Sequence, residues 1–145
     1  MATALFTPAR EGFLAGEIDW DTAVIKMALV RGYTFSAAHK FVSDVTTAGG
    51  VLVATSGALT SKTIAGGVAD AADVTFSAVP AQAGNAAITS LIIFQSSAVT
   101  GGADVAATAQ RLILFTDTYG NLPIVSNGGD IAVAFDNGAN RIFAL

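Results

Sequence analysis

The chain contains no cysteine and only one histidine, and these two shortages exclude several kinds of chemistry. Without cysteine, neither a disulfide framework nor a thiolate metal site can form. With His39 as its one imidazole, a zinc or other transition-metal site would have to rely on carboxylates, which match such metals poorly. The sequence therefore predicts no bound transition metal.

Charge is also scarce. Charged residues make up 12% of the 145 residues, about half of the usual quarter, while apolar residues make up 52%. Much of the surface must then consist of Ala, Thr, Ser and Gly, which lose little hydration free energy when another molecule covers them. This composition favours a subunit that is covered by neighbours in an assembly. A compact monomer with a neutral surface stays open as the simpler alternative.

The charges that are present are mostly acidic. The net charge is -4, and the seven Lys and Arg residues are scattered along the chain. Nucleic-acid binding needs a basic face that neutralises phosphates, so we expect no nucleic-acid partner.

No membrane or targeting segment is predicted. Residues 74–103 carry no charge, but Pro80, Gly84 and Gln95 interrupt them, and no run of about 18 apolar residues remains. The N-terminus lacks a basic region and reaches Arg10 and Glu11 too soon for a secretory signal.

Two short helices are expected in the N-terminal third. The first is predicted from Thr7 as its cap, with Pro8 at the first helical position and Gly16 at its end. The second is predicted from Ser36 as its cap through Val45, before Gly49 and Gly50.

The rest of the chain has strand patterns separated by turn residues. Residues 88–95 and 111–117 contain the related runs LIIF and LILF, which are apolar on both faces and are typical of central, covered strands. Turns are predicted at residues 119–121 and 127–129, and residues 136–138 predict a hairpin between strands 130–136 and 141–145. Three further strands are predicted at residues 22–30, 51–59 and 73–79. We therefore predict one mainly β domain over residues 1–145, an antiparallel sandwich or barrel of about eight short strands.

The best pair of carboxylates is Asp19 and Asp21, which flank Trp20 and have Glu17 nearby. In an extended segment both carboxylates would share one face and could bind a hard cation such as calcium, or act on a sugar stacked on Trp20. The simpler interpretation, which we prefer, is that two solvated aspartates flank a Trp packed in the core.

Three other polar residues are expected to be structural. His39, on the predicted second helix, has no nucleophile and carboxylate arranged beside it in the sequence, and no G-x-S-x-G motif is present. Asp70 and Asp73 follow Gly66-Gly67 without the spacing of a calcium loop, so we expect turn residues there.

Glycine pairs and scattered aromatics carry no binding motif. Gly101-Gly102 and Gly128-Gly129 lack the Lys-Ser/Thr of a phosphate loop. Tyr33, Phe35 and Tyr119 could line a ligand groove, but such aromatics usually belong to a core or an interface. The sequence thus predicts no catalytic, cofactor-binding or metal-binding residue.

Two segments are predicted to make contacts with other proteins. The Gly-, Ala-, Ser- and Thr-rich loop at residues 96–109 is longer than most connections, and loops of that length are often functional or disordered. We expect it to be a flexible contact arm that can become ordered on binding. The N-terminal residues 1–7 are expected to act as a second contact arm.

Several segments resemble small virion proteins of tailed bacteriophages, and together they cover nearly the whole chain. They are FTPAREGFL at residues 6–14, IDW at 18–20 with the strand at 24–30, VATS at 53–56, AADVTF at 71–76, LP at 122–123, NGGDI at 127–131 and DNGANRIF at 136–143. Phe135 stands where the resemblance leads us to expect Trp.

The resemblance implies a structural protein without enzymatic activity. It points to a capsid decoration (cement) protein in the virion, assembled in the host cytoplasm, or alternatively to a tail or neck component. The partners would be the major capsid protein or other virion proteins. The chain is also expected to form a homo-oligomer, with a trimer favoured. Two other functions stay open: a carbohydrate- or receptor-binding module using Trp20, Tyr33 or Tyr119, and a glycosidase-like enzyme using Asp19 and Asp21.

Overall fold

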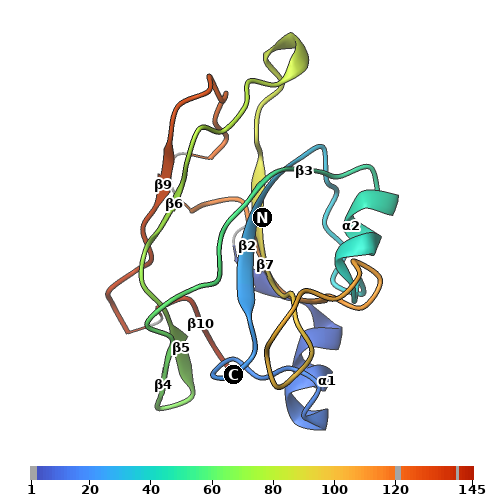
Figure 1. Ribbon diagram of the computed structural model, residues 1–145, viewed down its shortest axis with the longest axis vertical. Helices are drawn as coiled ribbons and strands as arrows, with labels where there is room; N and C mark the ends of the chain where they lie inside the picture. The colour runs from blue at the N-terminus through green and yellow to red at the C-terminus, as the bar shows by residue number, and fades with distance from the viewer. Residues whose placement is uncertain (1–2, 120–121, 140) are drawn as a thin grey trace.

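The computed structural model describes residues 3–119, 122–139 and 141–145. Within these ranges the chain is mainly β, and all its strand pairs are antiparallel, which confirms the predicted fold class. The described strands do not close into a barrel. Figure 1 shows both α-helices on one side of a central sheet and two smaller sheets on its other side.

The central sheet has the order β1-β8-β7-β2-β3, one smaller sheet has the order β10-β5-β4, and the other pairs β6 with β9. The strands are β1 (Ala4–Leu5), β2 (Ile25–Arg31), β3 (Val51–Thr55), β4 (Thr63–Ala65), β5 (Val68–Asp70), β6 (Val74–Phe76), β7 (Ser90–Gln95), β8 (Arg111–Thr116), β9 (Ile131–Val133) and β10 (Phe143–Ala144). The helices are α1 (Thr7–Ala15), α2 (Val42–Thr47) and the 3-10 turn η1 (Ala83–Asn85).

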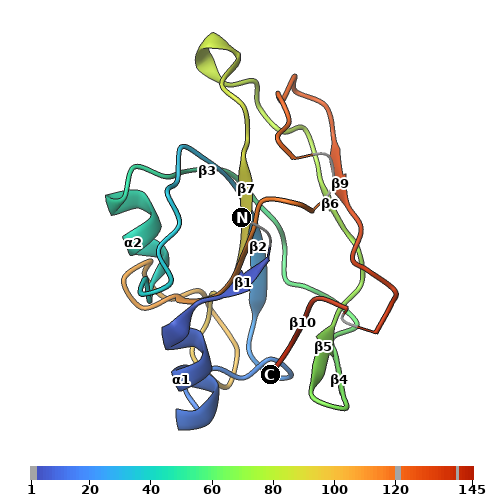
Figure 2. The ribbon, with the colours of Figure 1, turned by 180° about the vertical axis from the view of Figure 1, so that it is seen from behind.

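Strands β7 and β8 form the centre of the core, as their two-faced apolar sequences predicted. Every residue of both strands is buried. They pair directly, with Ile92 opposite Phe115 and Ile93 opposite Leu114. Each fully buried side chain of this size stabilises the fold by roughly 1.5–3 kcal/mol. The helices cover one face of these strands and the smaller sheets cover the other (Figure 2).

Helix α1 forms where it was predicted, with a shift at its start. Gly16 ends it in the left-handed conformation, at φ 73°, and its N–H donates to the carbonyls of Gly12 and Phe13. Thr7 is the first helical residue rather than the cap, because the wholly buried Phe6 occupies the cap position.

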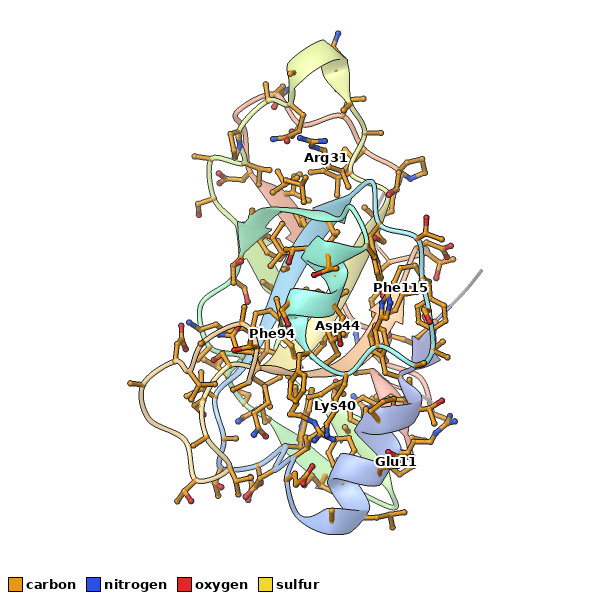
Figure 3. The ribbon with its side chains drawn as sticks, turned by 90° about the vertical axis from the view of Figure 1, so that its right-hand side faces the viewer. Glu11, Arg31, Lys40, Asp44, Phe94 and Phe115 are labelled. Carbon is orange, nitrogen blue, oxygen red and sulfur yellow. The ribbon has the colours of Figure 1, made fainter. Side chains whose placement is uncertain are left out.

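Helix α2 begins at Val42, six residues later than the predicted cap at Ser36. The carboxylate of Asp44 accepts hydrogen bonds from the N–H groups of Lys40 and Phe41, at 2.8 and 2.9 Å. These two bonds satisfy donors that a helix leaves unpaired at its start, and they fix the start at this point. Figure 3, in which Lys40 and Asp44 are labelled, views the molecule from this side.

The hairpin predicted between residues 130–136 and 141–145 is wrong. Strand β9 pairs with β6, and β10 pairs with β5. Residues 136–138, which suggested the hairpin, form only a local turn. The Asp136 carboxylate accepts a hydrogen bond of 2.8 Å from the Gly138 N–H in this turn. The predicted alternation along this segment is confirmed, since Val133 and Phe135 are buried while Ala132 and Ala134 are exposed.

A different hairpin, between β4 and β5, was not predicted. Its two-residue turn is Gly66-Gly67, with φ values of 60° and 78° that glycine adopts without steric strain. Asp70 therefore lies in a strand, where we had expected a turn. Of the other predicted turns, Gly128 is left-handed at φ 89°, whereas residues 120–121 lie outside the described ranges, as does Asn140.

Helix α1 packs closely enough on the sheet that one glycine of it has no room for a side chain. A Cβ atom at Gly12 would lie 2.5 Å from Nη2 of Arg111 and 2.8 Å from Cδ1 of Ile18. We expect Gly12→Ala to lower the free energy of unfolding by about 1–3 kcal/mol through overpacking. Urea unfolding followed by circular dichroism measures this change.

Gly57→Ala is the matched control, because a Cβ atom there would meet nothing within 4 Å. It should change the free energy of unfolding by less than about 1 kcal/mol. Equal losses in the two variants would contradict the close packing of α1.

Candidate functional site

Asp19 and Asp21 do not form the paired site that an extended segment would allow, because residues 19–22 form a turn. Oδ1 of Asp19 accepts hydrogen bonds from the N–H groups of Asp21 and Thr22, at 2.9 and 3.0 Å. Oδ2 accepts the Thr22 hydroxyl at 2.5 Å, and this bond is the main reason that the pKa of Asp19 is lowered. Both oxygens of Asp19 thus stabilise the turn itself.

Trp20 is a core residue, as the simpler interpretation predicted. It is only 3% exposed, and its indole N–H donates to the Asp70 carbonyl at 3.3 Å. Its ring meets that of Phe143 edge to face, with 5.1 Å between centroids. A ring enclosed in this way offers no open platform for a sugar.

Glu17 turns away from the two aspartates and forms an ion pair with Arg111. Arg111 is 7% exposed, its Nη2 donates to the Pro8 carbonyl at 2.7 Å, and its guanidinium lies 5.8 Å from the ring centre of Phe41. One buried cation therefore connects α1, the segment before α2 and the start of β8.

His39 is partly exposed, as predicted, but it lies in the segment before α2 and not on a helix. Its Nδ1 is 2.7 Å from the hydroxyl oxygen of Tyr33, and the two rings are in contact. Burial raises the pKa of Tyr33, and the Tyr33 ring also packs against Phe115. The histidine thus belongs to a hydrogen bond that supports the core.

The remaining aromatic candidates also pack inside the molecule. Phe35 lies against Phe6 and Phe115, with ring centroids 5.3 and 4.7 Å apart. Tyr119 packs on Phe135, and its hydroxyl donates to the Ile142 carbonyl at 3.2 Å. Both side chains are partly buried and pack against the core, which agrees with the expected core or interface position.

The two acidic residues expected in turns bind other parts of the chain. Asp70 pairs with Arg141 at 2.8 Å. Asp73 accepts a hydrogen bond of 2.9 Å from the Phe135 N–H, which holds β6 beside the segment that follows β9.

The N-terminal segment is part of the central sheet rather than a free arm. Ala4 and Leu5 form β1 and pair with Phe115 and Leu114 of β8, and Phe6 is wholly buried. Residues 1 and 2 of the predicted arm lie outside the described ranges.

The loop at residues 96–109 is exposed over most of its length but is held at several points. Ser97 Oγ accepts a hydrogen bond of 2.9 Å from the Val24 N–H, and Lys26 pairs with Asp104 at 2.7 Å. Gly101 lies so close to Thr22 that a Cβ atom would be 2.6 Å from its carbonyl oxygen. Apart from this one ion-paired Asp104, the loop presents an uncharged surface in a fixed conformation.

An apolar groove, which sequence reasoning missed, lies between α1, the β4–β5 hairpin and β10, and Val99 of the 96–109 loop also lines it. It has a volume of about 320 Å³, and Trp20, Val68 and Phe143 contribute to its floor. Figures 1 and 2 show these elements together at the end of the molecule where the chain reaches Leu145. Leu14 and Leu145 line an adjoining hollow that shares Phe13 with the groove.

One local signal pointed to this groove. Phe13 and Leu14 are neighbours on a helix, so both cannot face the same core. Phe13 packs on Phe143, whereas Leu14 is 90% exposed. The other exposed contributors, Ile64 and Leu145, are remote in sequence and come together only through the fold.

Among the described residues, no three His, Asp or Glu side chains gather in a way that could hold a metal ion. No helix within the same ranges has the length and apolar character needed to cross a bilayer. No protein-family model matches the chain, and no curated protein matches it. In the part of the chain that the structure describes, two surfaces that could bind a partner are the 96–109 loop and the apolar groove.

The turn at Asp19 gives a prediction about pH. Because the pKa of Asp19 in the folded chain lies below its ordinary value of 3.8, the ionised carboxylate stabilises the fold at pH values above that value. This contribution disappears as the pH falls through the lowered folded pKa. Asp19→Asn keeps an oxygen acceptor but removes the charge, so it should be less stable than the natural chain above pH ~4, and the difference should narrow as the pH falls from ~4 toward ~2.

Urea unfolding across this pH range measures the difference. Asp21→Asn is the control, because none of the turn's hydrogen bonds described above ends on the Asp21 carboxylate. A difference between Asp19→Asn and the natural chain that stays constant down to pH ~2 would refute the role given to the ionised carboxylate.

Proposed function

We propose that the chain is a structural subunit of a tailed-bacteriophage particle, a capsid decoration protein that binds the head shell. The observation that carries this proposal is the exposed, uncharged and firmly held surface of the 96–109 loop. The sequence resemblance to small virion proteins supports the particle as the place where this surface is used.

A fixed surface suits this role better than a mobile one would. A segment that folds on binding loses conformational entropy at that moment, whereas a loop already bonded to Val24 and Lys26 loses less. Its Ala, Gly and Thr residues also lose little hydration free energy when another protein covers them. The loop can therefore bind a neighbouring protein through shape, without a charged anchor.

The polar side chains that were considered as catalytic or metal-binding residues stabilise the fold, which supports a structural role. Both carboxylate oxygens of Asp19, Oε2 of Glu17 and Nδ1 of His39 make contacts within the chain. Of the three aromatics considered for glycan binding, Trp20 and Tyr33 are buried, and Tyr119 is partly buried with its ring against Phe135.

The mechanism we propose is mechanical. The protein would bridge neighbouring copies of the major capsid protein, so that internal pressure acts on a larger buried area. A tail or neck position would use the same surface on other virion proteins. The location on the particle separates these two possibilities.

We expect the protein to co-purify with intact particles and to lie on the head shell. Cryo-electron microscopy, or gold labelling of a tagged chain, measures its position. Density for the protein on the tail or neck would show that it is a tail or neck component and not a capsid decoration protein. A protein that is abundant in lysate and absent from purified particles would overturn the structural proposal.

The loop itself can be tested on the same particles. Ala103→Glu places a charge on the exposed loop, and burying an unpaired charge at a contact is unfavourable. We expect particle occupancy to fall by at least about tenfold. Ala58→Glu, at an exposed alanine outside the loop, should bind like the natural chain. Equal occupancy of both variants would exclude the loop as the contact.

A further inference from the structure

The most exposed large apolar side chains gather on one face. Within the described ranges, Leu14, Leu145 and Ile64 are 90%, 65% and 60% exposed, and all three lie along the apolar groove and its adjoining hollow. Apolar patches of this kind on a soluble protein usually mark an interaction site. The elements that carry them lie together at the lower end of the molecule in Figure 2.

Opposite charges mark the two ends of this face. Arg10 lies beside Leu14, one helical turn earlier on α1, and none of the described acidic side chains forms an ion pair with it. Asp19 lines the groove but not the hollow that contains Arg10; its ionised carboxylate also accepts the hydrogen bonds of its own turn and has Lys62 near it. The face thus runs from a cation, through an apolar centre, to an anion.

A face with this order of charges is complementary to itself. A two-fold axis through the apolar centre reverses the direction of the second copy. Asp19 of the second copy then lies opposite Arg10 of the first, and Asp19 of the first lies opposite Arg10 of the second. The same operation sets Leu14 of each copy at the groove of the other, whose volume of about 320 Å³ exceeds that of a leucine side chain.

We propose that the apolar groove is a self-association face through which two copies of this chain form a two-fold dimer. Three exposed side chains cover only a part of the ~800 Å² per partner that a stable interface needs. The outer surface of α1 and the β4–β5 hairpin, which border the groove, supply the rest of the face.

The two-fold arrangement differs from the trimer that the sequence favoured. A ring of three needs two different faces that bind each other, whereas here both charged ends lie on one face. The dimer proposal does not depend on the proposed role in the virus particle, because self-association is a property of the purified chain.

Sedimentation velocity on the purified chain tests the proposal. We expect a species of twice the monomer mass of 14.6 kDa. Leu14→Glu should weaken the dimer by on the order of 100-fold, because two apolar contacts are lost and two charges are introduced. Its thermal unfolding as a monomer should be normal, because Leu14 is 90% exposed and contributes nothing to the core.

Val125→Glu is the matched control, since Val125 is 50% exposed and lies outside the residues that line the groove. It should sediment like the natural chain. A natural chain that stays monomeric up to ~100 µM, or that forms trimers, would overturn the two-fold face, and so would a Leu14→Glu variant that still dimerises. Particle occupancy is measured separately, so failure here is distinguishable from failure of the capsid proposal.

Discussion

The arrangement of the helices against the sheet depends on the buried side chain of Arg111. It stands at the start of β8, reaches under α1 to Glu17 and the Pro8 carbonyl, and lies beside the ring of Phe41. Burying a guanidinium is unfavourable unless its charge and N–H groups are satisfied. Glu17, just after α1, pairs with Nη1 and the Pro8 carbonyl accepts from Nη2, whereas Nε has no hydrogen-bond partner among the described residues. Gly12 leaves the space that the guanidinium occupies.

The position of α1 in turn creates the surface that we connect with function. The helix forms one wall of the apolar groove, and its outer side carries Arg10 and Leu14. The groove and the 96–109 loop are both poor in charge, in keeping with a composition in which only 12% of residues are charged. Both surfaces can be covered by another molecule with little loss of hydration.

Much of this fold could be predicted from local sequence, and the errors have a common physical cause. The LIIF and LILF strands and the end of α1 at Gly16 depend on residues close to one another, so their patterns were sufficient. The pairing of β9 with β6 and of β10 with β5 joins segments that are far apart in the chain, and the local turn at Asp136 suggested the wrong partner. The groove was missed for the same reason, because its exposed side chains come from three separate elements.

The central claim is that Arg111 holds α1 on the sheet and so keeps the wall of the groove in place. Hydrogen exchange of Arg111→Met, which keeps the apolar stem but removes the charge and the N–H donors, tests it most directly. The account predicts faster exchange of the amides of α1 while those of β7 stay protected. Unchanged protection of α1, or an equal loss of protection throughout the central sheet, would contradict it.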